Sequence, residues 1–167
     1  MQFVEFEMNI NNIIQSFIIS GSLLLFVDCA IPHAVATAPM ASASRDIETK
    51  NFVHSPDKAV IYIYRDEYAA YYVFMGILVD KQPIARTVSW SYLRLELSPG
   101  HHEITSRAEK DDEFAFQAEA GNLYFLRQVV MPGIKLPRSK LVSVPENDGR
   151  TGVNKCKLLD VPTTVPE

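Results

Sequence analysis

The stretch SYLRLELSPGHHEI, Ser91–Ile104, decides the fold. Its first half alternates between leucines and amphipathic or charged residues: Leu93, Leu95 and Leu97 alternate with Tyr92, Arg94 and Glu96. Such alternation predicts a β-strand over Ser91–Ser98 with one buried face. The Pro99-Gly100 step ends this strand, and we expect the next strand, His101–Ala108, to turn back and pair with it.

The stretch KAVIYIYRD, Lys58–Asp66, predicts a strand in the middle of a sheet. It is rich in β-branched and aromatic residues, which favour strands. One face carries Tyr62 and Tyr64, and the other carries Ile61 and Ile63. Because both faces are apolar, we expect both to be covered.

Two further pairs of strands are separated by turn residues. Tyr71–Asp80 and Ile84–Val88 flank the turn DKQP and predict one hairpin. Phe114–Ala120 and Leu123–Val130 flank a Gly-Asn step and predict a second hairpin.

The remaining sequence adds one short strand, Lys140–Val144, and a segment, Pro145–Leu159, that fits either a short helix or a ragged tail. The chain therefore contains about seven or eight short strands, with turns at about 8 to 12 residue spacing and no helical crossover. This pattern predicts an all-β fold, an antiparallel β-sandwich, with an N-terminal hydrophobic signal or anchor helix.

The N-terminal part contains fifteen uncharged residues, Ile13–Val27. A membrane-spanning helix needs about 20 apolar residues, so this run fits a secretory signal better. Small residues permit cleavage after Ala36 or after Ala43, although no Lys or Arg precedes Arg45. An uncleaved anchor and a buried hydrophobic helix are the alternatives.

The predicted organisation has four parts. Residues 1–36 are a signal peptide or N-terminal anchor, and 37–57 are a flexible linker. The β-sandwich domain spans 58–159, and 160–167 form a disordered tail. We expect an exported protein of the periplasm or cell envelope, either soluble or membrane-anchored.

The two cysteines have different expected roles. Cys29 follows the apolar run and is a candidate lipidation site, but Phe26, Val27 and Asp28 form an unusual flank. The alternative is an ordinary cysteine within a discarded signal. Cys156 would then be alone, so it forms no internal disulfide and is interpreted as a half-buried structural thiol. Pairing with another chain and a role as catalytic nucleophile are the alternatives.

The charges argue against two classes of partner. The chain has 16 Lys and Arg against 20 Asp and Glu, for a net charge of -4. From residue 37 onward the charges almost cancel and form no basic stripe. We therefore expect no nucleic acid partner, and membrane contact only through the N-terminal segment.

The polar residues do not predict a catalytic or metal site. His101 and His102 are adjacent on a strand, so they point to opposite faces and cannot both bind one ion. The carboxylates of Asp66 and Glu67, and of residues 111–113, fall in loops where water solvates them. Arg65 ends an apolar strand and is expected to pair with a carboxylate such as Glu67 or Glu119.

The sequence motifs of common catalytic and nucleotide-binding sites, G-x-S-x-G and G-x-G-x-x-G, are missing. We therefore expect no cofactor.

Three segments together resemble the bacterial family named domain of unknown function 2846. They are KAVIYIYRDE, YLRLELSPGHHEI and AEAGNLYFLRQ, which contain Ala59–Arg65, Leu93–His102 and Ala120–Phe125. The turn motifs are also similar to those of PEGA-type modules. The resemblance covers Lys58–Leu159 and implies an exported protein or lipoprotein of the cell envelope with a β-sandwich fold. It supplies no catalytic residues.

Aromatic residues in the first half of the domain suggest a binding role. The candidate partner surface consists of Tyr68, Tyr71, Tyr72, Trp90 and Tyr92, and it suits an envelope protein or a glycan. Core or edge-strand filling explains some of these rings equally well.

The preferred interpretation is a non-enzymatic binding or scaffolding module. The alternatives are a hydrolase or metal-dependent enzyme of unrecognised type, and a purely structural partner of a larger envelope assembly. Convergence of ionisable side chains in a pocket, such as His101 with Glu103 or Asp66, would favour an enzyme.

Overall fold

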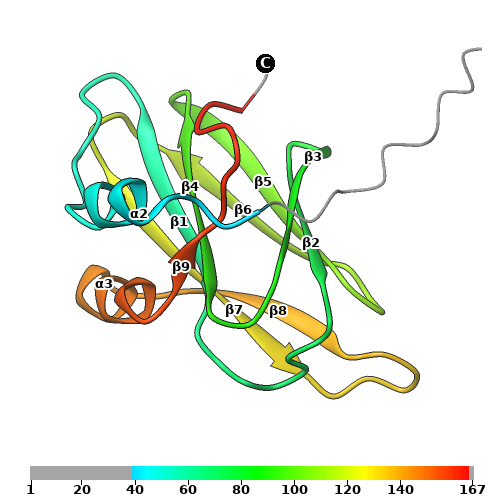
Figure 1. Cartoon of the computed structure of the whole chain (residues 1–167). Coiled ribbons are helices and arrows are strands. Elements are labelled where there is room, and N and C mark those ends of the chain that lie inside the picture. The colour runs from blue at the N-terminus through cyan, green and yellow to red at the C-terminus, as the bar shows by residue number, and fades with distance from the viewer. Residues whose placement is uncertain (1–38, 166–167) are drawn as a thin grey trace, which may run out of the picture. The chain divides into compact units, whose positions relative to one another are not determined.

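The computed structural model describes residues 39–165, which form a mostly β fold with two sheets (Figure 1). The first sheet has the strand order β8-β7-β1-β4-β9, and the second has the order β3-β2-β5-β6. The expected signal or anchor segment and Cys29 lie outside the described residues. None of the helices within 39–165 has the length and hydrophobicity needed to cross a membrane.

The elements follow one another along the chain in this order. They are α2 (Ala43–Thr49), β1 (Ala59–Arg65), β2 (Met75–Val79), β3 (Gln82–Thr87), β4 (Ser91–Leu97), β5 (Gly100–Arg107), β6 (Asp112–Ala118), β7 (Leu123–Met131), β8 (Arg138–Ser143), α3 (Glu146–Asn154) and β9 (Lys157–Leu158).

Strand β1 is the central strand, as its sequence predicts. All seven of its residues are buried. Ile61 and Ile63 belong to the core shared by the two sheets, whereas Tyr62 and Tyr64 belong to a second cluster on the outer face of the first sheet. The second cluster contains Phe52, which follows α2, and Val153 of α3. The two apolar faces of β1 are therefore covered by different elements: the second sheet covers one face, and Phe52 and α3 cover the other.

The β2–β3 hairpin is also confirmed, although its first strand begins at Met75 and not at Tyr71. Its two turn residues, Asp80 and Lys81, have φ values of 50° and 68°. Positive φ at both central residues defines the tight turn whose twist matches that of antiparallel strands. The pairing register shifts between Ile77 and Leu78, and Pro83 lies opposite Leu78 on the edge strand. An edge position suits proline, which has no N–H to donate.

The predicted pairing of β4 with β5 is wrong. Strand β4 pairs with β1 on one edge, and on its other edge with β9 and with Thr164. Both edges are occupied, so the chain crosses at Ser98-Pro99 to the second sheet. There β5 pairs with β2 and β6. Gly100, with φ of 144°, permits the change of direction.

The second predicted hairpin is also wrong. Strand β6 stays in the second sheet, whereas β7 enters the first sheet and pairs in parallel with β1. Gly121 has the expected positive φ, 81°, but it turns the chain between sheets. Strands β4 and β9 are also parallel, so the first sheet is mixed and not purely antiparallel.

The segments on either side of the predicted domain contain ordered structure that their sequences did not indicate. Within the expected linker, Ser42 caps α2 and Phe52 is buried. Within the expected tail, Val161 is buried and the Thr163 carbonyl accepts a hydrogen bond from Glu96 N at 2.7 Å. These segments cover the outer tyrosine face and the β4 edge, which would otherwise be exposed to water.

Pro145–Leu159 fits either a short helix or a ragged tail by sequence, and the structure shows the helix, α3. A Cβ atom on Gly152 would lie 2.2 Å from the Tyr64 ring, and one on Gly149 would lie 2.2 Å from Phe125. Because neither glycine has a side chain, the helix lies directly on the aromatic rings of the first sheet. The glycines that argue against a helix by propensity are thus needed for its packing.

Candidate functional site

The last residue of β1, Arg65, is fully buried and fixes the loop that follows it. Its guanidinium donates hydrogen bonds to the carbonyl oxygens of Ala69, Ala70 and Val73 at 2.6, 2.6 and 2.7 Å. Burial lowers the pKa of Arg65, although an arginine keeps its charge at physiological pH. The prediction of a carboxylate partner is therefore wrong, because peptide carbonyls accept the hydrogen bonds of the guanidinium instead.

The loop held by Arg65, residues 66–74, presents aromatic side chains to solvent. Exposed fractions are 74% for Tyr68, 52% for Tyr71 and 87% for Tyr72. The Tyr68 and Tyr71 rings stack with centroids 6.1 Å apart, and Tyr72 meets Tyr71 edge-on at 5.0 Å. Three of the five aromatic residues in the predicted surface are therefore neighbours on one exposed loop.

Of the other two aromatic residues of that prediction, Trp90 stays with the exposed rings and Tyr92 does not. Trp90 packs edge-on against Tyr68 at 5.3 Å, and its backbone N donates to the Arg65 carbonyl at 2.8 Å. Tyr92 is fully buried, with its ring in the outer cluster beside Tyr62. Including Tyr92 in a surface is thus wrong, because it lies on the face of β4 that the outer cluster covers.

A second exposed loop, which we take as residues 131–137 so as to include Met131 at the end of β7, lies next to the first. The Glu109 carboxylate holds it: Oε2 accepts from Ile134 N at 2.9 Å, and Oε1 accepts from Lys135 N at 2.7 Å. Arg138 Nε donates to the same carboxylate at 2.9 Å. These backbone hydrogen bonds, reinforced by Arg138, lower the pKa of Glu109 to about 2.

Together the two loops form one apolar surface, which we call the two-loop surface. Between them lies a groove of about 390 Å³, lined by Ala69, Ala70, Val130, Met131, Pro132, Gly133, Lys135, Leu136 and Pro137. Among residues 39–165, seven of the eleven exposed large hydrophobic side chains lie on these loops: Tyr68, Tyr71, Tyr72, Phe74, Met131, Ile134 and Leu136. In Figure 1 the loops that join β1 to β2 and β7 to β8 lie at the same end of the sheets.

Ionisable side chains do converge in one small pocket of about 180 Å³ beside the β2–β3 turn. His102 Nδ1 lies 2.5 Å from Asp80 Oδ2, and His102 Nε2 lies 2.8 Å from the Ser98 carbonyl oxygen. The other Asp80 oxygen accepts from Glu103 N at 2.9 Å. Both ring nitrogens and both carboxylate oxygens are thus engaged in bonds that tie the turn to β5.

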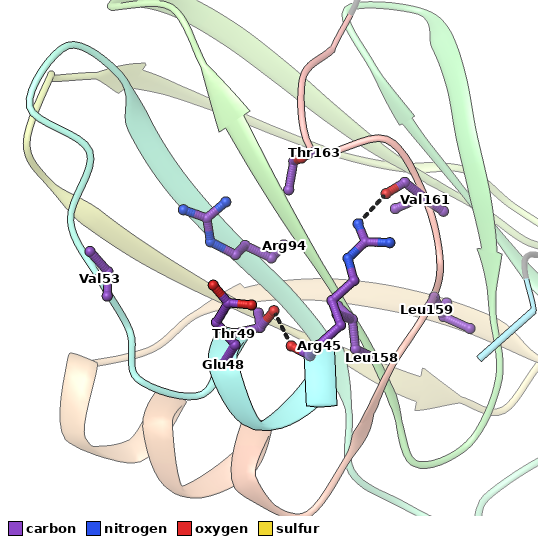
Figure 2. A pocket seen from close by; sticks show the side chains of 9 residues that line it. All are labelled: Arg45, Glu48, Thr49, Val53, Arg94, Leu158, Leu159, Val161 and Thr163. Carbon is purple, nitrogen blue, oxygen red and sulfur yellow. Dashed lines mark hydrogen bonds between the residues drawn. The ribbon is translucent and has the colours of Figure 1, made fainter. Parts of the chain in front are cut away.

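A cleft of about 350 Å³ lies between α2 and the C-terminal segment (Figure 2). Arg45 and Arg94 line it, together with Thr49 and Thr163. Arg45 forms an ion pair with Asp160 and donates to the Val161 carbonyl, and Arg94 donates to Glu96 at 2.8 Å. Since both arginines already have carboxylate partners, the cleft has no surplus of positive charge for an anion.

The remaining candidate groups are structural. Asp66 accepts from Arg127 at 2.8 Å and Glu67 accepts from Val130 N at 2.6 Å, so neither is the solvated loop carboxylate that the sequence predicts. The Cys156 thiol is buried, and burial raises its pKa to about 12. Within residues 39–165, no three His, Cys, Asp or Glu side chains are grouped to hold a metal ion.

The sequence predicts an irregular loop over Met131–Ser139, but not that this loop contributes to a candidate binding surface. The only signal was the pair Ile134 and Leu136 within a stretch rich in proline and glycine, between two strands. Apolar residues in a turn region are not assigned to a strand or helix core, so they are candidates for an exposed contact.

Comparison with known families supports the resemblance that the three sequence segments indicate. The family model described as a protein of unknown function (DUF2846) matches residues 55–138. The chain belongs to the DUF2846 family. No curated protein and no solved structure matches the chain.

The DUF2846 match covers the whole two-loop surface. It includes Arg65, Trp90, Glu109 and both loops, whereas the cleft in Figure 2 has only Arg94 within the matched range. The two-loop surface therefore belongs to the part of the chain that defines this DUF2846 protein as a family member.

We expect Arg65→Met to lower the free energy of unfolding by about 3 kcal/mol, because three carbonyl oxygens lose their donor. Urea unfolding measures this change, and amide hydrogen exchange of Val73 reports loosening of the loop. The matched control is Arg107→Met, whose side chain is 57% exposed and whose cost should stay within about 0.5 kcal/mol. Unchanged exchange at Val73 would show that Arg65 does not fix the loop.

The loop 131–137 should respond to acid through Glu109. Because the folded-state pKa is about 2 and the usual value is 4.5, stabilisation by Glu109 is complete above about pH 4.5 and is lost as the pH falls toward 2. NMR shifts of the Ile134 and Lys135 amides should follow this titration. Glu109→Gln should abolish it and Glu113→Gln should not; a midpoint near the usual value would contradict the geometry.

Proposed function

We propose that this DUF2846 protein is an exported, non-enzymatic binding module of the bacterial cell envelope, and that it binds through the two-loop surface. The observation that carries the proposal is the concentration of exposed apolar side chains on two neighbouring loops. Exposed apolar patches on soluble domains commonly mark interaction sites.

The loops are ordered before any partner arrives. Arg65 bonds three carbonyl groups of one loop, and Glu109 accepts amide hydrogens from the other. A surface ordered in advance loses little conformational entropy on binding. Tyrosines add large contact areas with few rotatable bonds, which supports a role in binding rather than accidental exposure.

The enzyme alternative has less support. The ionisable groups that converge near His102 are engaged by Asp80 and by the Ser98 carbonyl, and these bonds explain their positions. Cys156 is buried, and its pKa of about 12 disfavours the thiolate.

Export is supported by the sequence of the N-terminal part. Mass spectrometry of the mature N-terminus from fractionated cells tests it. We expect a chain that begins at Thr37, or one with lipid on Cys29, in the envelope fraction, because a start at Ser44 would remove the Ser42 cap of α2. An intact Met1 in the cytoplasmic fraction would overturn the export half of the proposal.

Photo-crosslinking in intact cells tests the binding half. A diazirine amino acid at Tyr72 should form an adduct with an envelope component, since this side chain is 87% exposed on the two-loop surface. The same probe at Ile47, which is 69% exposed on α2, is the matched control. Adding Ile134→Asp should abolish the Tyr72 adduct; equal labelling at both positions would contradict a specific surface.

A further inference from the structure

We infer that the two-loop surface contacts the headgroup boundary of a phospholipid bilayer. This inference rests on the proposed function, because it assigns a partner to the same surface. It extends membrane contact from the N-terminal segment, where the sequence places it, to the folded domain.

The shape and composition of the surface suit a bilayer. Its most exposed side chains are Tyr72 at 87%, Ile134 at 86% and Tyr68 at 74%, and Leu136 follows at 62%. Aliphatic side chains that project from a loop can enter the acyl region, and tyrosine rings favour the interface because one end is apolar and the other polar. The groove behind these side chains is lined mainly by apolar residues.

The charges of the surface also suit anionic lipid headgroups. Lys135 lies between Ile134 and Leu136, and within residues 39–165 no ion pair involves its ammonium group. A lysine between two inserted side chains places its apolar stem beside them and its ammonium at the phosphates. Arg86 adds a second cation next to the surface, 4.9 Å from the centre of the Phe74 ring.

Three acidic residues of this region have partners within the domain. Glu109 is bonded to the backbone of its loop and to Arg138, and Glu67 accepts from Val130 N. Asp66 pairs with Arg127 and has a side chain only 9% exposed. Their negative charges are therefore offset within the domain, and they add little repulsion toward anionic lipids.

The sequence also places an apolar run close to the domain. Eleven residues separate Val27 from Pro39, the first described residue. Such a segment spans at most about 40 Å when fully extended. Retention of the apolar run in a bilayer would therefore hold the domain beside that bilayer, where a weak surface contact is sufficient for binding.

Quenching of tryptophan fluorescence by brominated lipid tests the inference. The chain has a single tryptophan, so Trp90→Phe provides a silent background. The protein in the form isolated from cells is mixed with vesicles of phosphatidylethanolamine and phosphatidylglycerol that carry bromine in their acyl chains. Ile134→Trp is the reporter variant, Leu136→Trp is a second reporter, and Ile47→Trp on α2 is the matched control.

We expect about twofold quenching of the indole introduced at 134 or 136, and little quenching of the one at 47. Lys135→Glu in the reporter background should reduce the quenching. Equal quenching at all three positions, or none at 134 and 136, would overturn the inference.

The two proposals fail in different ways. If lipid does not quench the loop reporters while the Tyr72 crosslink in cells persists on a protein or glycan, the bilayer inference fails and the binding function stands. Loss of both the quenching and the crosslink would overturn both proposals.

Discussion

The buried guanidinium of Arg65 is the interaction on which the exposed surface depends. A charged group without water needs polar partners, and the carbonyl dipoles of the next loop supply them. The backbone oxygen of Arg65 also accepts hydrogen bonds from the Trp90 amide at 2.8 Å and from the Cys156 thiol at 3.6 Å. One residue thus connects the aromatic loop, the start of β4 and the C-terminal part of the first sheet.

Local sequence patterns identified the strands well but not their partners. The two apolar faces of β1 and the Asp80-Lys81 turn were readable because both depend on neighbouring residues. The crossings at Ser98-Pro99 and at Gly121 were not, because a turn within a sheet and a turn between sheets have the same local signature. For β4 the choice follows from its own edges, which pair with β1 and with β9 near the end of the chain. For β7 it follows from the edge of β1 that β4 leaves open.

The candidate surface was predictable in part for a similar reason. Tyr68, Tyr71 and Tyr72 are close in sequence and remain close in space, whereas the fate of Tyr92 depends on α2 and Phe52, which cover it. The contribution of Ile134 depends on Glu109, twenty-five residues earlier in the chain, whose carboxylate shapes its loop. Composition and spacing reveal aromatic clusters, but not the distant ion that orders a turn.

The parallel pairing of β1 with β7 has a consequence for the order of folding. The central strand leaves one edge open until residues 123–127 are available, and the far edge of β4 stays open until β9 and the segment around Thr164 arrive. The sheet therefore closes only when almost the entire domain has been synthesised. Until then, a hydrophobic strand with an unpaired edge is exposed to aggregation.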